Sequence, residues 1–326
     1  MYNEVTFTAV ALVFVWIVLL LLDLLVSGVT ALVSGLRFGR VFCWGLLSLI
    51  LPVLLIAYGV LIERNWFKVN KIELAFDNLP EQFDGYRLVQ LSDIHSMSFR
   101  NRAGQLDRAV GMVGELAPDL VVFTGDLITV SPDELDVTAP VLERLSAPDG
   151  VISVLGNHDY STHRNAGKTD TEALDYLIQR ERALGWKLLL NEKVILRRGG
   201  DSLAVVGVEN ISSSKFFPST GNLAVASGGT DGLFRILLSH DPQHWDMEVS
   251  GMDFPLTLSG HTHAAQVSLL GWSPARLMFR RVRGLFSENG RYLYINQGLG
   301  ETAFPARIGV RPEITLITLR RKRADS

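Results

Sequence analysis

The chain has 326 residues, 48% of them hydrophobic, and a formal net charge of −3. This length is enough for one large domain and an additional segment. The near-balanced charge provides no concentrated basic surface, so we expect no nucleic-acid partner. Cys43 is the only cysteine, which excludes a disulfide framework and a cysteine-rich metal site and leaves the redox compartment open.

Two long apolar runs open the chain, at residues 7–26 and 41–62. Each is long enough to span a bilayer as a helix. A buried core helix or a cleaved signal peptide is the alternative, but the first run lacks a basic start and a small-residue cleavage site, and the second run follows directly. We predict two transmembrane helices within a membrane anchor over residues 1–70.

Charged residues beside these runs leave the orientation open. Asp23 lies near the end of the first run, where a carboxylate can reach the membrane interface, and Pro52 is a candidate kink in the second run. The first run has no Lys or Arg before it, and Arg37 and Arg40 follow it, which favours a cytoplasmic connector and an extracytoplasmic domain. The basic residues that follow the second run favour the reverse; these are Arg64, Lys68 and Lys71.

Residues 71–326 have the pattern of an α/β domain. The first half alternates predicted strands at 71–76, 86–91, 120–123 and 151–155 with helices that begin near Leu106 and Pro132. A β-α-β-α-β order implies parallel strands with helices between them. A helix at about 171–184 is followed by predicted strands at 186–190, 193–197, 203–208, 234–238, 255–258, 292–295 and 314–319, and 212–230 is predicted as a loop. We predict a four-layer αββα sandwich of two mixed sheets.

Five clusters of metal-binding residue types follow these strands. The central one is Gly156-Asn157-His158-Asp159, and the others are Asp93-Ile94-His95, Gly125-Asp126, Ser239-His240-Asp241 and Gly260-His261-Thr262-His263. Because the carboxyl ends of parallel strands meet at one edge, one rim can gather all five. Asp, Asn and His without Cys suit Mn, Fe, Zn or Co. Two ions about 3.5–4 Å apart can generate hydroxide and stabilise in-line displacement at phosphorus, and Asp126 is suited to bridging them.

The clusters, in this order between about Ile72 and Leu319, resemble the calcineurin-like metallophosphoesterase family. The segments 91–95 and 296–300 are most similar to its membrane-associated bacterial branch, some members of which hydrolyse the pyrophosphate of UDP-2,3-diacylglucosamine or resemble enzymes that do. The resemblance implies that one ion is bound by Asp93, His95, Asp126 and His263, and the other by Asp126, Asn157, His240 and His261. It also implies that His158 is not a ligand but protonates the leaving oxygen or stabilises the phosphoryl charge, oriented by Asp159.

We therefore expect a dinuclear phosphoesterase anchored in the bacterial cell membrane, with Mn, Fe or Zn as cofactors. A metal-bound hydroxide would attack a phosphodiester or pyrophosphate, carried by a lipid or another envelope intermediate. A tethered phosphomonoesterase or cyclic-nucleotide phosphodiesterase is the enzyme alternative. A non-catalytic membrane scaffold is a further alternative, although such a protein would be expected to lose ligands or the acid. Metal identity, natural substrate and oligomeric state stay open.

Three groups lie outside the five clusters. His163, after the central cluster, is a candidate substrate contact or a solvated loop residue, and His244 is predicted at the surface. Arginines at 276, 280, 281 and 283 alternate with aromatic and apolar residues between Trp272 and Phe286, a mixture that suits either an ordinary loop or contact with an anionic amphiphile. The basic tail at 320–323 is predicted to be solvated, with anionic lipid as the alternative partner.

Overall fold

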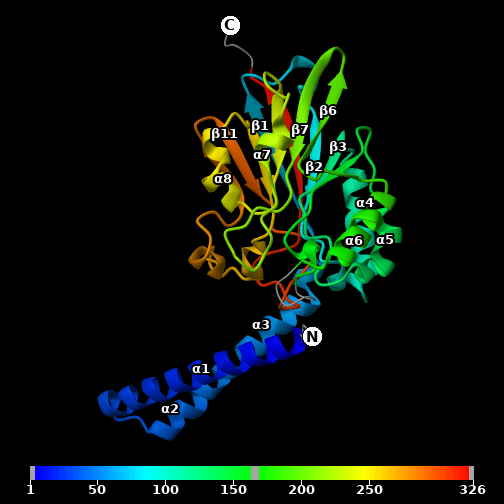
Figure 1. Ribbon diagram of the computed structural model, residues 1–326. Helices are drawn as coiled ribbons and strands as arrows, with labels where there is room; N and C mark the ends of the chain where they lie inside the picture. Colours follow the sequence, from blue (N-terminus) through cyan, green and yellow to red (C-terminus); the bar gives the residue numbers. More distant parts are fainter. Residues whose placement is uncertain (1–3, 163–168, 323–326) are drawn as a thin grey trace.

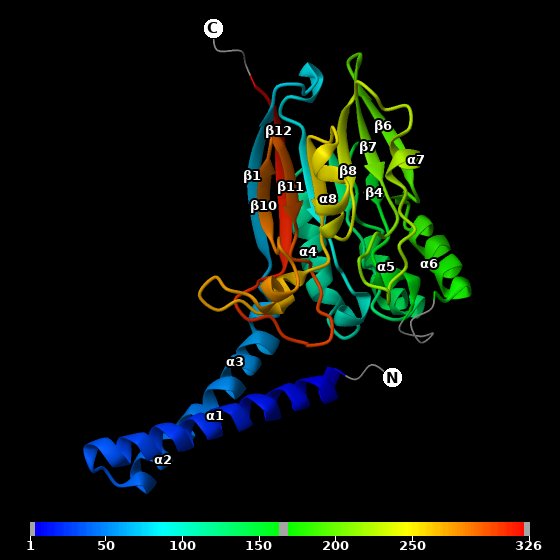
Figure 2. The same ribbon diagram turned by 60° about the vertical axis from the view of Figure 1, so that its left-hand side comes forward.

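The computed structural model describes residues 4–162 and 169–322 (Figure 1). A hairpin of apolar helices extends from one end of an α/β body whose first strand begins at Lys68 (Figures 1 and 2). The end of the described chain lies at the opposite end of the body from the hairpin.

Two six-stranded mixed sheets form the body. The first has the strand order β1-β12-β2-β3-β4-β5, and the second has the order β10-β11-β9-β8-β7-β6. In the first sheet, β2 to β5 are parallel and β12 is antiparallel to β2. In the second, β11, β9, β8 and β7 are parallel, between antiparallel outer strands. The strands are β1 (Lys68–Phe76), β2 (Arg87–Leu91), β3 (Leu120–Phe123), β4 (Val151–Ser153), β5 (Lys187–Leu188), β6 (Glu192–Arg198), β7 (Asp201–Gly207), β8 (Phe234–Leu238), β9 (Leu256–Ser259), β10 (Gly284–Glu288), β11 (Arg291–Ile295) and β12 (Glu313–Arg321).

The continuous apolar runs reflect burial on both faces of each sheet. In β3, Val122 points between the sheets and packs in a cluster with Leu256 of the second sheet, whereas Val121 points the other way and packs with Leu106 and Leu177 of the covering helices. These helices are α4 (Ala103–Glu115), α5 (Leu135–Leu142) and α6 (Thr171–Ala183); α7 (Leu223–Ser227) and α8 (Gln243–Met247) cover the second sheet. The predicted four-layer αββα sandwich is confirmed.

Three short elements were not predicted. The predicted loop 212–230 contains α7, and α8 and β10 are additional. The two helices have five residues each, too few to show a helical repeat. Strand β10 is an edge strand with largely exposed residues, so it lacks the apolar run by which the inner strands were recognised.

The hairpin contains α1 (Glu4–Ser34), α2 (Phe38–Gly45), a 3-10 turn (Leu46–Leu49) and α3 (Ile50–Leu61). Its candidate membrane spans are Leu12–Ser34 and Phe38–Asn65, and most of their side chains are exposed. A core helix would be covered by other parts of the protein, so the exposure of these side chains disfavours the buried-core alternative. Pro52 was a candidate kink, and the helix is irregular one turn before it, at the 3-10 turn. A proline ring displaces the carbonyl four residues earlier in a helix, and here that carbonyl belongs to Ser48, which lies in the 3-10 turn.

Asp23 differs from its prediction. Helix α1 continues to Ser34, so Asp23 lies well inside the span rather than near its end. Its side chain is buried, packs against Gly45 of α2, and accepts a hydrogen bond from the Ser27 hydroxyl at 3.2 Å. Because α2 folds back along α1, Asp23 meets a neighbouring helix instead of the membrane interface.

Glu181 of α6 is a buried acid outside the clusters. It is fully buried, and neither of its carboxylate oxygens has a hydrogen-bond partner within the described residues. Burial, reinforced by the charge of Asp159, raises the pKa of Glu181 to about 8. The folded protein therefore holds this proton at pH values at which the unfolded chain has released it.

We predict that Glu181→Gln flattens the pH dependence of stability. The free-energy contribution of the protonated wild-type side chain is fully present below about pH 4.5, where the unfolded chain is also protonated. It is lost as pH rises to about 8, by an amount on the order of a few kcal/mol. Thermal unfolding in detergent at pH 5 and pH 8 measures this change. Equal losses of midpoint temperature in both proteins would show that another group is responsible.

Candidate metal centre

All five clusters lie at the carboxyl ends of parallel strands. The clusters after β2, β3 and β4 come from the first sheet, and those after β8 and β9 come from the second. Several of their residues have backbone angles in the left-handed region, which non-glycine residues rarely adopt; these are Asp93, His95, Asp126, His261 and His263. Such strain is typical of functional sites, and here it turns five side chains toward one rim.

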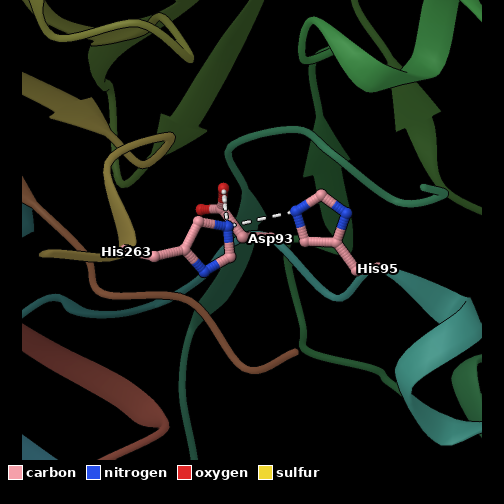
Figure 3. A group of neighbouring side chains, drawn as sticks. All are labelled: Asp93, His95 and His263. Atoms are coloured by element: carbon pink, nitrogen blue, oxygen red, sulfur yellow. Dashed lines mark hydrogen bonds and ion pairs between the residues drawn. The ribbon is translucent and has the colours of Figure 1, made fainter. Parts of the chain in front are cut away.

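The first group of side chains is Asp93, His95 and His263 (Figure 3). Nε2 of His263 lies 3.2 Å from Oδ1 of Asp93 and 3.1 Å from Nε2 of His95. Both oxygens of Asp93 also accept hydrogen bonds from the His261 amide, at 3.0 and 3.1 Å. The group is therefore held at the point where the two sheets meet.

The second group lies on the other side of Asp126. Oδ2 of Asp126 is 3.1 Å from Nε2 of His240 and 3.7 Å from Nε2 of His95. The amide oxygen of Asn157 is 3.1 Å from the same His240 nitrogen, and His261 completes the set. Asp126 thus lies between the two groups, which is the position that a bridging ligand requires.

The electrostatics favour the ligand forms of His95, His261 and Asp126, but not that of His240. Burial lowers the pKa of His95 well below its usual value and also lowers that of His261, which favours neutral imidazoles. Burial opposes ionisation of Asp126, but His240 and His158 outweigh it and keep the pKa of this carboxyl well below its usual range. A metal ligand must be deprotonated, and these three residues meet that condition. Burial opposes protonation of His240, but the Asp126 carboxylate beside it outweighs burial and raises the pKa of His240 to about 10, so a bound cation would have to replace this proton.

The donor set fits two divalent ions. Ring nitrogens of His95 and His263 face each other and a carboxylate in a fully buried space, an arrangement that a shared cation stabilises. Nδ1 of His240 lies 2.7 Å from the Thr124 carbonyl oxygen, so Nε2 is the ring nitrogen that faces Asp126 and Asn157. The residues are those expected for borderline-hard ions.

His158 is adjacent to the first group. Its ring packs edge-on against His95, with ring centres 4.9 Å apart, and its amide donates to Oδ1 of Asp126 at 2.8 Å. With His95 and Asp126 it also forms a set of side chains close enough to share an ion. Its ring Nδ1 is 2.8 Å from the Thr129 carbonyl oxygen.

Asp159 does not orient the His158 ring as predicted. The Thr129 carbonyl oxygen lies at Nδ1 of that ring instead. The Asp159 carboxylate accepts four backbone hydrogen bonds of 2.7–3.1 Å, from the amides of Gly156, Asp126, Leu127 and Ile128. Each bond to a charged acceptor contributes about 1.5–3 kcal/mol. Asp159 therefore joins the β3 and β4 loops and positions Asp126, which corrects its expected role.

Glu134 is a supporting residue that lies outside the predicted clusters. Its carboxylate accepts hydrogen bonds from the amides of Met97, Thr129, Val130 and Ser131. It thereby fixes the backbone that presents the Thr129 carbonyl to His158. The sequence Ser131-Pro132-Asp133-Glu134 has the spacing of a helix capping box, which would have identified Glu134 in advance.

Two glycines allow the loops to approach each other. A Cβ atom at Gly156 would overlap the Asp126 carboxylate, and one at Gly260 would overlap Asp93 and Ser92. Neither position can therefore accept a side chain without displacing a residue of the first or second group.

The residues outside the clusters have different outcomes. The prediction that His244 lies at the surface is wrong: it is buried, with Nδ1 2.9 Å from the Ser239 hydroxyl and Nε2 3.0 Å from Glu248. Its helix, α8, packs on the second sheet and turns this ring inward.

Two other predictions concern His163 and the basic tail. His163 lies outside the described residues. In the basic tail, Arg320 pairs with Glu73 and Lys322 with Asp77, and Arg323 lies outside the described residues. The end of β12 lies at the end of the body opposite the hairpin (Figure 1), which disfavours a lipid contact there.

In the arginine-rich segment 272–286, some arginines bind neighbouring side chains and others are exposed. Arg281 forms ion pairs with Asp246 and Glu288, and Arg283 donates to Gln297 and Ser268. Arg276 and Arg280 are exposed. All but Arg281 line a cavity of about 440 Å³ together with Phe279, whose ring packs edge-on against His261. The segment therefore borders the second metal-binding group.

Comparison with known proteins agrees with this geometry. A family model described as calcineurin-like phosphoesterase matches residues 86–265. The chain is 30% identical over 273 residues to the uncharacterized metallophosphoesterase YkuE of Bacillus subtilis, covering 81% of this chain and 89% of YkuE. It is 28% identical over 307 residues to the UDP-2,3-diacylglucosamine pyrophosphatase LpxG of Chlamydia trachomatis, covering 76% of this chain and 88% of LpxG.

A eukaryotic relative is also similar. The chain is 33% identical over 283 residues to a transmembrane protein with metallophosphoesterase domain from Danio rerio. The match covers 84% of this chain but 62% of that protein, so this chain spans less than two thirds of its length.

We predict that substitutions of different ligand residues lower the metal content of the protein by different amounts. Wild-type protein loaded with Mn should hold about two ions per chain. His263→Ala should lose about one ion, and Asp126→Ala should lose both, because Asp126 lies between the groups. Elemental analysis of the purified proteins measures this, with His244→Gln as a control at a buried histidine that belongs to neither ligand group. An Asp126→Ala protein with the same metal content as this control would contradict a shared ligand.

Proposed function

The chain belongs to the calcineurin-like phosphoesterase family and is a metal-dependent phosphoric ester hydrolase, and we propose that it cleaves a phosphodiester or pyrophosphate bond in a lipid-linked substrate. The observation that carries this proposal is the position of Asp126 between two histidine-rich groups, with His158 beside them. We assign one ion to Asp93, His95, Asp126 and His263, and the other to Asp126, Asn157, His240 and His261.

The chain's own residues supply a proton donor. Two bound divalent ions would supply a nucleophile at neutral pH and neutralise charge on the phosphoryl oxygens. Nδ1 of His158 lies 2.8 Å from the Thr129 carbonyl oxygen, and we assign Nε2 as the nitrogen that donates a proton to the leaving oxygen. His158 is 9% exposed, whereas His95 behind it is fully buried. A substrate can therefore reach the His158 ring but not the His95 ring.

Support for a lipid-linked substrate comes from the anchor and from two relatives. We assign residues 1–70 to a membrane anchor and residues 71–326 to the phosphoesterase domain, in keeping with the two apolar candidate spans. The Danio rerio relative is a transmembrane protein, and LpxG is a UDP-2,3-diacylglucosamine pyrophosphatase. The hairpin also leaves the body at the end where the metal-binding loops lie, so an anchored domain would present its rim toward the bilayer.

A substrate panel tests the proposal. We expect wild-type protein with Mn to hydrolyse UDP-2,3-diacylglucosamine and bis-p-nitrophenyl phosphate, and to hydrolyse p-nitrophenyl phosphate more slowly. Activity should disappear with chelator and in Asp126→Ala. The His244→Gln protein is the control for general damage.

Each other outcome favours a different function. Preference for p-nitrophenyl phosphate would indicate a tethered phosphomonoesterase, and preference for a soluble cyclic nucleotide would indicate a cyclic-nucleotide phosphodiesterase. Metal content without turnover of any ester would indicate a non-catalytic scaffold.

The role of His158 predicts a dependence on the leaving group. General acid catalysis contributes about 10²–10⁴-fold, but p-nitrophenolate leaves without protonation. His158→Ala should therefore reduce kcat about 10²-fold or more for an ester with an alkyl leaving group, and much less for the p-nitrophenyl ester. The comparison needs equal metal content in both proteins. Equal losses on the two esters would show that His158 stabilises the phosphoryl group instead of protonating the leaving oxygen.

A further inference from the structure

An apolar groove of about 470 Å³ lies between the hairpin and the α/β body. Side chains of α1 and α3, including Leu19, Leu55 and Ile56, form one wall. The other wall comes from two loops of the body, through Ala265, Val267 and Phe304. The volume lies within the range of small-molecule pockets, and the lining residues present almost no polar atoms.

The loop wall is directly connected to the metal-binding rim. Ala265 and Val267 follow the predicted ligand His263 by two and four residues. Gln266, buried between them, donates to the carbonyls of Phe304 and Ala306 and accepts from the Thr302 amide at 2.6 Å. The two loops therefore form one joined wall, and a molecule in the groove would lie next to the chain segment that carries His263.

The helix wall is also fixed to the body. The Gly59 carbonyl of α3 accepts a hydrogen bond from the Arg307 amide, and Glu63 accepts one from the Gly309 amide at 2.9 Å. Arg64 donates to the Pro305 carbonyl at 3.0 Å. A side chain at Gly59 would overlap the Arg307 carbonyl. These contacts hold α3 beside the loop 305–309, so the groove is a defined feature of the fold.

The surroundings of the groove are those of a lipid. Its helix wall belongs to the two candidate spans, whose outer faces are exposed and apolar. Beyond its loop wall, the segment after Val267 carries exposed apolar side chains at Leu269, Leu270, Trp272, Leu277 and Met278. Exposed Arg276 and Arg280 are in the same segment. Apolar side chains with arginines are typical of a surface that meets lipid tails and anionic headgroups.

We propose that this groove binds an acyl chain of the lipid-linked substrate. The chain would stay among α1, α3 and the loops 264–267 and 304–308, while the phosphate-bearing headgroup reaches the rim next to His263. The acyl chain would thereby remain in an apolar environment during catalysis, at a favourable free energy of about 0.8 kcal/mol per buried methylene. The inference rests on the proposed function for the identity of the headgroup, but not for the presence of an acyl chain.

Photo-crosslinking tests the groove without requiring turnover. Full-length protein is placed in nanodiscs of phosphatidylethanolamine and phosphatidylglycerol that contain phosphatidic acid with a diazirine on one acyl chain. We expect adducts on the peptides that contain Val267 and Phe304. Leu55→Trp should fill the groove and reduce these adducts at least fivefold. Leu54→Trp is the matched control, because Leu54 is 60% exposed and does not line the groove.

A second pair of variants probes the groove from α1. Leu19→Trp should reduce the same adducts, whereas Leu21→Trp, on the exposed face of the helix, should not. Absence of adducts from both loops would overturn the proposal. Equal labelling in groove variants and controls would also overturn it, since it would indicate general lipid contact or occupation by another protein segment.

Kinetics provide the second readout. Leu55→Trp should lower kcat/KM for UDP-2,3-diacylglucosamine with long acyl chains about tenfold and leave kcat/KM for bis-p-nitrophenyl phosphate unchanged. Equal losses on both substrates would contradict an acyl-chain site. If wild-type protein does not hydrolyse the lipid nucleotide, the proposed substrate fails, and the crosslinking result still decides whether the groove holds an acyl chain.

Discussion

The hydrogen bonds of one carboxylate hold the metal-binding rim together. Asp159 is fully buried and accepts four backbone amides from the loops after β3 and β4. These bonds offset part of the cost of burying its charge, although burial and the neighbouring Asp126 still raise the pKa of Asp159 to about 7. They also set the backbone of Asp126, which lies between the two ligand groups. On the other side, Asp93 holds the His261 amide and so joins the two sheets. The rim therefore depends on carboxylates that bind backbone as much as on those that face an ion.

The loops that follow the ligands connect the rim to the hairpin. His263 is followed by the segment that Gln266 ties to the loop 302–308, and this loop contacts α3 through Arg307. Arg307 is fully buried, donates to the carbonyls of Gln297, Gly298 and Gly300, and lies 3.4 Å from Nδ1 of His263. Its guanidinium satisfies carbonyls that would otherwise be buried without partners. The hairpin and the rim are thus parts of one packed structure.

Much of the fold was predictable because its strands are buried on both faces. Runs such as 120–123 and 234–238 match β3 and β8 to the residue, and the order of strands and helices restricts the topology. The errors have local physical causes. Helices α7 and α8 are too short to show a period, β10 lies at an edge, and His244 is polar yet turned inward by α8. Asp23 was misplaced because a single span gives no indication of the helix that folds against it.

Apolar runs and the residue types at strand ends are enough to predict the sandwich, the family and the residues that gather at the rim. The partner that each side chain meets follows only from the folded structure. That structure placed the Thr129 carbonyl on His158 and directed Asp159 to backbone amides. It also formed the groove between α3 and the loops 264–267 and 304–308. Carbonyl groups and packed surfaces carry no residue-specific pattern, and contacts between distant segments arise only when the chain has folded.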